Sequence, residues 1–206
     1  MGLSADTLAA SLHALAADHP PIAAALAAHG LPEPRARERG VSAMMRAIVA
    51  QQVSTKAAAS IWNRLEAACG GTMDDIAAVA ATPFDVLRSA GLSGQKASYV
   101  HALAEAVASG RIDFAALPAD DDEAVALLSS VKGIGRWSAE IYLLFAEGRT
   151  DIFPAGDLAL QIQLGRLLGQ AARPTDRQAR LLAEPMRPHR SALSIMLWHQ
   201  YNIVAL

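Results

Sequence analysis

The stretch Leu127–Leu168, LLSSVKGIGRWSAEIYLLFAEGRTDIFPAGDLALQIQLGRLL, decides the fold. Its centre is Gly133-Ile134-Gly135, two glycines around one apolar residue. Apolar side chains recur at helical spacing before these glycines and again from Trp137 to Phe145, which predicts two amphipathic helices. Because glycine has no Cβ, the backbone can turn tightly and its N–H groups can approach a ligand. The sequence therefore predicts a helix, a hairpin and a second helix whose N-terminus can bind phosphate.

A second break in the chain follows this helix pair. Phe153-Pro154-Ala155-Gly156 interrupts the helical pattern, and Asp157 precedes a new apolar stripe formed by Leu160, Leu164, Leu167 and Leu168. An aspartate at this point ordinarily caps a helix, because its oxygen accepts N–H groups of the first turn. A lone Gly-Ile-Gly is likewise more often a plain turn. The combination of a hairpin with a carboxylate one helix later is what indicates a functional site.

The order hairpin, tryptophan, helix, Phe-Pro-x-x-Asp-Leu resembles the helix-hairpin-helix DNA glycosylases, and within them the 3-methyladenine DNA glycosylase II branch. Matching blocks at Arg46–Ser54 and at Arg187–Ser191 with Trp198 extend the resemblance from about residue 41 to about residue 200. We expect a short form of this branch, because residues 1–40 contain no β-rich segment. The resemblance implies a monofunctional enzyme of base excision repair. Such an enzyme flips an alkylated purine, of the 3-methyladenine or 7-methylguanine type, out of double-stranded DNA and hydrolyses its N-glycosidic bond.

The composition favours a soluble, all-α protein. The chain of 206 residues is 52% hydrophobic and rich in alanine, a strong helix former, and it contains no β-rich segment. It shows neither a basic signal sequence nor an apolar run of about 18 residues, so we expect a cytoplasmic protein, a monomer, without membrane contact. A single cysteine, Cys69, excludes a four-cysteine iron–sulfur cluster, and we expect no cofactor apart from the cation considered below.

The resemblance also implies how the chain divides. Residues 41–155 are expected to form a barrel-like helical domain that carries the hairpin. Residues 1–40 are expected to pack with residues 156–206 into a second helical domain formed by both chain ends, with the active-site groove between the two domains.

Asp157 is the candidate catalytic residue. An alkylated purine is positively charged and already a good leaving group, so no general acid is needed, whereas the deoxyribose becomes oxocarbenium-like and must be stabilised. At about 4 Å and an effective dielectric near 20, a carboxylate contributes roughly 4 kcal/mol, about a thousandfold in rate. The same carboxylate can orient or deprotonate the water that completes hydrolysis.

Aromatic residues are the candidates for the base pocket. Trp137 and Trp198 occupy the positions that line this pocket in the resembling family, and the face of an indole attracts a cationic base. One relative has a further aromatic residue where this chain has Ile141. We therefore expect either weaker stacking at this point or a stacking contact supplied by the neighbouring Tyr142. The third tryptophan, Trp62, lies mid-helix among apolar residues and is predicted to belong to the core.

Two glutamines end the helix predicted from Val41. Gln52 stands where a relative has a leucine wedge, and it can fill the gap left by the flipped nucleotide while it hydrogen-bonds the orphaned base. Gln51 is expected to support the loop or the pocket. Both glutamines can equally be a plain helix end and turn.

The predicted DNA-binding residues lie mainly at the hairpin: Lys132, Gly133, Ile134, Gly135 and Arg136, with Arg190 from the last helix. By resemblance, the backbone carbonyls of Ser129, Val131 and Ile134 hold a monovalent cation. A net charge of −2 is low for a DNA-binding protein. The charge is nevertheless uneven, since residues 124–206 carry nine Lys and Arg against six Asp and Glu.

Other functions stay open at this point. A non-catalytic helix-hairpin-helix DNA-binding protein would keep the hairpin but needs neither Asp157 nor pocket aromatics, and a glycosylase for ethenoadenine or hypoxanthine would share the same site. A glycosylase with lyase activity forms a Schiff base through a lysine. In lyase-competent relatives that lysine stands where this chain has Trp137, while Lys132 precedes the hairpin and Lys56 and Lys96 lie on other helices. We therefore expect no lyase activity.

Overall fold

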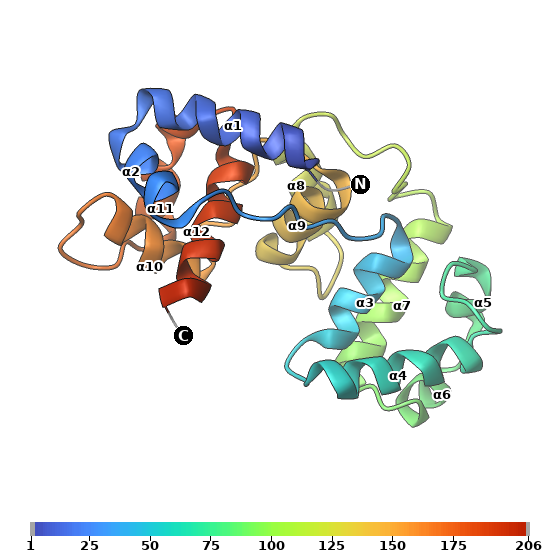
Figure 1. Ribbon diagram of the computed structural model, residues 1–206. Coiled ribbons are helices and arrows are strands. Elements are labelled where there is room, and N and C mark those ends of the chain that lie inside the picture. The colour runs from blue at the N-terminus through green and yellow to red at the C-terminus, as the bar shows by residue number, and fades with distance from the viewer. Residues whose placement is uncertain (1–2, 205–206) are drawn as a thin grey trace. The chain divides into compact units, whose positions relative to one another are not determined.

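The computed structural model describes residues 3–204, which contain helices and loops and no strand (Figure 1). The all-α class predicted from the composition is confirmed. The chain divides into two compact units, one formed by residues up to Arg37 together with residues from Glu140 onward, the other by Glu38–Ala139. Among residues 3–204, every helix is too short or too polar to span a lipid bilayer.

The boundaries of these units differ from the predicted ones. The structure divides the chain after Arg37 rather than after residue 40, and after Ala139 rather than after residue 155. The second boundary falls inside helix α9 (Arg136–Tyr142). Its physical reason is that residues beyond it interact with the C-terminal helices, as the buried Glu140 does with Arg180 across 3.1 Å.

The unit Glu38–Ala139 contains six complete helices: α3 (Val41–Ala50), α4 (Thr55–Ala68), α5 (Ile76–Ala81), α6 (Phe84–Ser89), α7 (Gly94–Ala108) and α8 (Asp121–Ser129). Helix α3 packs against α4 and α7, and α5 packs against α7 (Figure 1). Hydroxyl and carboxylate caps fix where the helices begin. Ser93, for example, accepts the N–H of Lys96 at the start of α7, and Asp120 accepts that of Glu123 at the start of α8.

Trp62 lies in the core of this unit, as predicted, with 2% of its surface exposed. The guanidinium of Arg46 lies 4.1 Å from the centroid of its indole ring, a cation–π contact between α3 and α4. Cys69 is a buried free thiol. The periodicity of apolar residues therefore located these core positions correctly.

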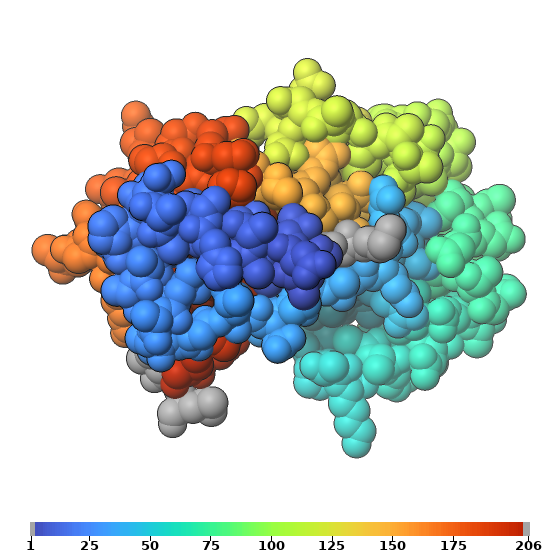
Figure 2. Space-filling view, turned by 45° about the horizontal axis from the view of Figure 1, so that its top comes forward, coloured from blue at the N-terminus to red at the C-terminus, as the bar shows by residue number. Residues whose placement is uncertain are grey.

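The other unit joins both ends of the chain. It contains α1 (Ala5–Asp18), α2 (Pro20–His29), a π-helical turn η1 (Leu143–Glu147) that continues α9, α10 (Leu158–Leu167), α11 (Asp176–Leu182), a 3₁₀ turn η2 (Glu184–Met186) and α12 (Arg190–Val204). Helix α12 packs against α10 and α1, and α1 packs against α2. In the space-filling view the blue surface of α1 and α2 accordingly borders the red surface of the C-terminal helices (Figure 2).

Candidate active site

The hairpin between α8 and α9 depends on its two glycines for different reasons. Gly133 has φ 96°, in the left-handed region, and a Cβ at this residue would overlap the ring of Tyr99 from α7. A side chain is therefore excluded at Gly133 by both backbone strain and packing. Gly135 is exposed, and an added Cβ there would meet no atom within 4 Å. The backbone at Gly135 is consequently open to a ligand.

A hollow of about 610 Å³ lies beside the hairpin within the same unit, lined by the hairpin, the start of α7 and the Gln51-Gln52 turn. The Gln51 side chain donates a hydrogen bond from Nε2 to the carbonyl of Gly133, at 3.4 Å, in agreement with the loop-supporting role expected for it. Lys96 donates from Nζ to the carbonyl of Val49 at the end of α3, at 2.8 Å, and burial lowers the pKa of Lys96. The turn and the hairpin thus form one polar surface.

Gln52 is exposed at the tip of this turn and has φ 55°. A left-handed conformation is uncommon for a residue other than glycine and costs on the order of 1 kcal/mol. Its position is compatible with the predicted wedge role, because the side chain is available to an approaching duplex.

The basic hairpin residues Lys132 and Arg136 are exposed, and Arg136 forms an ion pair of 3.1 Å with Asp122 in the first turn of α8. Ile134 turns its side chain into the core and donates its N–H to the carbonyl of Val131, at 3.1 Å. Ile134 can therefore offer only backbone atoms to a ligand. Among the described residues, His, Cys, Asp and Glu side chains form no cluster that could hold a metal ion.

The two predicted pocket residues on α9 differ in exposure. Trp137, in the unit that carries the hairpin, is 48% exposed, which leaves much of its indole available for stacking. Tyr142, in the other unit, is only 5% exposed. A ring that stacks on a flipped base needs an accessible face, so the prediction that Tyr142 supplies stacking is not supported by this geometry.

Asp157 caps α10, as predicted, and has a second role in the structure. Its Oδ1 accepts the N–H of Leu160, at 3.1 Å, and also the indole N–H of Trp198 from α12, at 3.2 Å. Both Asp157 and Trp198 are partly exposed. The structure therefore joins the predicted catalytic carboxylate and one predicted pocket aromatic within a single unit. No pattern in the sequence indicated this contact.

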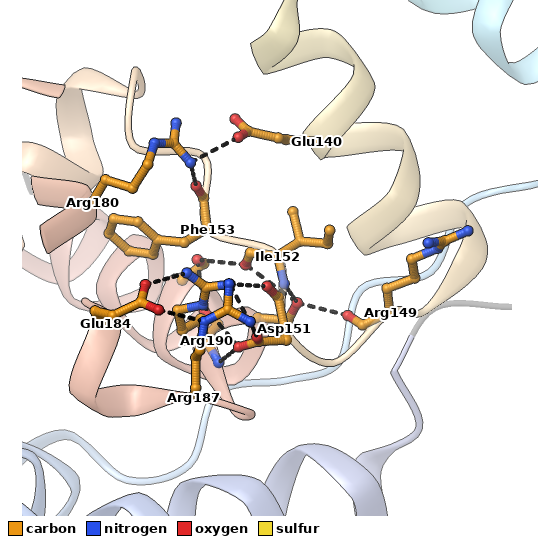
Figure 3. A network of polar contacts seen from close by, with 11 residues as sticks. Glu140, Arg149, Asp151, Ile152, Phe153, Arg180, Glu184, Arg187 and Arg190 are labelled. Carbon is orange, nitrogen blue, oxygen red and sulfur yellow. Dashed lines mark hydrogen bonds and ion pairs between the residues drawn. The ribbon is translucent and has the colours of Figure 1, made fainter. Parts of the chain in front are cut away.

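Arg190 does not have the DNA-binding role predicted for it (Figure 3). It is 6% exposed, and its guanidinium forms a bidentate pair with Asp151, from Nε to Oδ1 at 2.8 Å and from Nη2 to Oδ2 at 3.0 Å. A third donor, Nη1, reaches Glu184 at 3.1 Å, and Arg187 adds a further contact to Asp151 at 2.9 Å. The prediction is wrong because Arg190 is buried and its donors are committed to the buried Asp151 carboxylate and to Glu184 at the surface.

This network anchors the segment that leads to Asp157 (Figure 3). Ser191 accepts the N–H of Ile152 at 2.9 Å and donates to the carbonyl of Arg149 at 2.6 Å. Arg180 donates to the carbonyl of Phe153 at 3.4 Å and pairs with Glu140. These contacts were not predicted from the sequence. The one feature of the sequence that could have indicated them is Asp151, a charged residue directly before the apolar run Ile152-Phe153.

The fold and site define a class of protein: an all-α chain with a helix-hairpin-helix, followed one helix later by a partly exposed aspartate at a helix N-terminus. Residues 45–188 match the HhH-GPD superfamily of base excision DNA repair proteins, and the chain belongs to this family. The family expected from the hairpin, the Phe-Pro-x-x-Asp segment and the flanking blocks is thus confirmed.

Similar proteins come from yeast and bacteria. The chain is 31% identical over 158 residues to DNA-3-methyladenine glycosylase 1 of Schizosaccharomyces pombe, across 75% of this chain and 69% of that protein. The crystal structure of DNA-3-methyladenine glycosidase from Bacillus halodurans has a TM-score of 0.76 at 28% identity, covering 91% of this chain and 92% of that one. The S. pombe 3-methyladenine DNA glycosylase in complex with abasic DNA has a TM-score of 0.71 at 26% identity, covering 90% and 92%.

Proposed function

We propose that this protein is a monofunctional DNA glycosylase that removes alkylated purines, of the 3-methyladenine and 7-methylguanine type, from double-stranded DNA in base excision repair. The observation that carries the proposal is the partly exposed Asp157 carboxylate at the start of α10, bonded to Trp198, in a chain of the HhH-GPD family. Similar proteins named 3-methyladenine glycosylases support this substrate class.

In the proposed reaction, Asp157 acts on the sugar. The bond between C1′ and the purine nitrogen breaks, and its electron pair leaves with the alkylated base, which thereby loses its positive charge. The carboxylate stabilises the positive charge that develops on the deoxyribose and orients the water that adds to C1′. The proton that this water loses passes to the carboxylate and then to solvent. Because the leaving group needs no protonation, the site does not require a separate general acid.

The hairpin is proposed to hold the DNA backbone. Gly135 exposes its backbone, and Lys132 and Arg136 present positive charge beside it. The exposed indole of Trp137 can stack on the flipped base, and Gln52 can enter the space that the base leaves. The structure of the S. pombe relative with abasic DNA supports DNA as the partner.

A monovalent cation at the hairpin belongs to the proposal. Ser129, Val131 and Ile134 all line the hollow beside the hairpin. The Val131 carbonyl accepts one hydrogen bond, from the Ile134 N–H. A carbonyl oxygen has a second lone pair and can therefore also coordinate a hard cation. Such an ion would add positive charge next to phosphate. We further propose that the enzyme acts in the cytoplasm, on chromosomal DNA.

The test is a panel of duplexes that each contain one lesion: 3-methyladenine, 7-methylguanine, ethenoadenine or hypoxanthine. We expect release of the methylated purines by the native protein and none by Asp157→Asn. Release of ethenoadenine or hypoxanthine alone would change the substrate class. Binding to all duplexes without any base release would identify a DNA-binding module instead.

A further inference from the structure

We propose that Trp198 is a positioning residue that fixes the orientation of the Asp157 carboxylate through its indole N–H, and that Phe145 and Arg37 hold this indole in place. The inference rests on the proposed function, because it assigns how the catalytic carboxylate is held. It gives Trp198 a role different from stacking on the flipped base.

Two hydrogen bonds orient the Asp157 carboxylate. One oxygen, Oδ1, accepts both the Leu160 N–H and the Trp198 indole N–H, at 3.1 Å and 3.2 Å. The cap alone restrains the carboxylate from the side of its own helix, whereas the indole restrains it from α12. Two donors from different helices define the direction of the carboxylate more narrowly than one donor does. Trp198 therefore determines which way Asp157 faces.

Phe145 fixes the plane of that indole. The rings of Phe145 and Trp198 are stacked, with centroids 5.5 Å apart and an angle of 29° between their planes. Phe145 is 5% exposed and lies in the π-helical turn η1, a type of turn that often marks a functional site. Because Phe145 covers one face of the Trp198 indole, a flipped base can reach at most the other face.

Arg37 supports Phe145 from the N-terminal segment. Its backbone N–H donates to the Phe145 carbonyl at 2.9 Å, and its guanidinium lies 5.6 Å from the centroid of the Phe145 ring. An exposed cation–π contact of this kind is a weak stabilising interaction. Arg37, Phe145, Trp198 and Asp157 thus form a continuous series of contacts inside one unit.

The position of Trp198 along α12 makes the arrangement rigid. The helix begins at Arg190, which is locked to Asp151, and Trp198 lies about two turns further along the same helix. The same Asp151 belongs to the segment that leads into Asp157, so the donor and the acceptor of the 3.2 Å bond share one anchor.

The decisive experiment removes the indole N–H and keeps the ring. Trp198 is replaced by 3-benzothienylalanine, in which sulfur takes the place of N–H, and single-turnover base release and duplex affinity are both measured on DNA with one 7-methylguanine. Since a hydrogen bond to a charged group is being lost, we expect the rate constant to fall about tenfold or more, while Kd changes by less than twofold. A residue that only stacks on the base would not respond to this exchange.

Trp62 provides the matched control. Its indole N–H is buried and has no hydrogen-bond partner among residues 3–204, so the same replacement there should leave both the rate constant and Kd unchanged. Phe145→Leu, which removes the stacking ring but retains apolar volume, should lower the rate constant without a change in Kd. Arg37→Gln should have a smaller effect in the same direction.

The outcomes separate this inference from the proposed function. An unchanged rate constant after the exchange at Trp198, together with an inactive Asp157→Asn, would overturn the positioning role and leave the glycosylase assignment intact. Full base release by Asp157→Asn would remove the proposed mechanism itself. A large increase in Kd with an unchanged rate constant would show that Trp198 contacts DNA instead.

Discussion

The indole nitrogen of Trp198 lies 3.2 Å from Oδ1 of Asp157, and the same oxygen caps α10 by accepting the N–H of Leu160. The helix cap is therefore compatible with the catalytic role proposed for this aspartate. The cap places the carboxylate at the positive end of a helix dipole, and the indole orients it from a second helix. In the proposed reaction, this helix N-terminus therefore presents an oriented carboxylate to the positive charge that develops on the sugar.

We expect Asp157→Asn to lose base release by about a thousandfold, because the amide keeps an oxygen for both hydrogen bonds but lacks the negative charge. Duplex affinity should stay within about twofold of the native value. Release is measured by chromatography of free bases and affinity by fluorescence anisotropy. Asp75→Asn is the matched control, since Asp75 caps α5 in the same way, accepting the N–H of Ala78 at 3.0 Å. Comparable turnover of both variants would contradict the assigned role.

Gly135→Asp should remove measurable binding to damaged and undamaged duplex alike, because it places an anion where phosphate is expected to approach. The variant should fold normally, since the position is exposed and a Cβ there meets no atom within 4 Å. Gly135→Ala, which adds volume without charge, should retain most of the affinity. Thermal unfolding of each variant separates binding from stability. Native affinity of Gly135→Asp would mean that another surface holds DNA.

Arg190→Ala should destabilise the protein by about 3–5 kcal/mol, because it leaves the buried Asp151 without its bidentate partner. The measurement is the free energy of unfolding in urea. Arg173→Ala, at an exposed position, should change it by less than about 0.5 kcal/mol. If Arg190 instead contacted phosphate, its loss would weaken DNA binding and leave the unfolding free energy almost unchanged.

The affinity for DNA should depend only weakly on salt. A net charge of −2 and a hairpin that uses backbone N–H groups predict a slope of log Kd against log salt that corresponds to about two to four phosphates. Titrations between low and moderate potassium chloride concentrations give this slope directly. A value near ten phosphates would indicate a strongly basic contact surface that the sequence does not contain.

Base release should occur without strand nicking, and borohydride should trap no protein–DNA adduct. Trp137 stands at the position of the lyase lysine in the resembling family. Lys96, whose pKa is lowered by burial, donates its Nζ to the Val49 carbonyl at the end of α3. The measurement is gel electrophoresis of the borohydride-treated complex. A trapped adduct that disappears in Lys96→Met would identify a lyase and its nucleophile.

The sequence by itself determined those features that depend on neighbouring residues. Apolar periodicity placed Trp62 in the core, and the glycines marked the hairpin between α8 and α9. Asp157 was recognised as a helix cap because an N-cap bond joins residues three positions apart. In each case the pattern that identifies the residue extends over only a few helical turns of sequence, so the residue types and their spacing were sufficient.

Only the tertiary structure decided which polar groups pair with each other when they are far apart in the sequence. Arg190 and Asp151 are separated by 39 positions, and Trp198 and Asp157 by 41. An arginine in a DNA-repair sequence can equally face phosphate or a carboxylate, and a tryptophan can stack or donate. Local sequence fixes neither choice. The outcome depends on which side chain another helix brings opposite, because burial of a charge or an N–H group costs free energy that a complementary partner offsets.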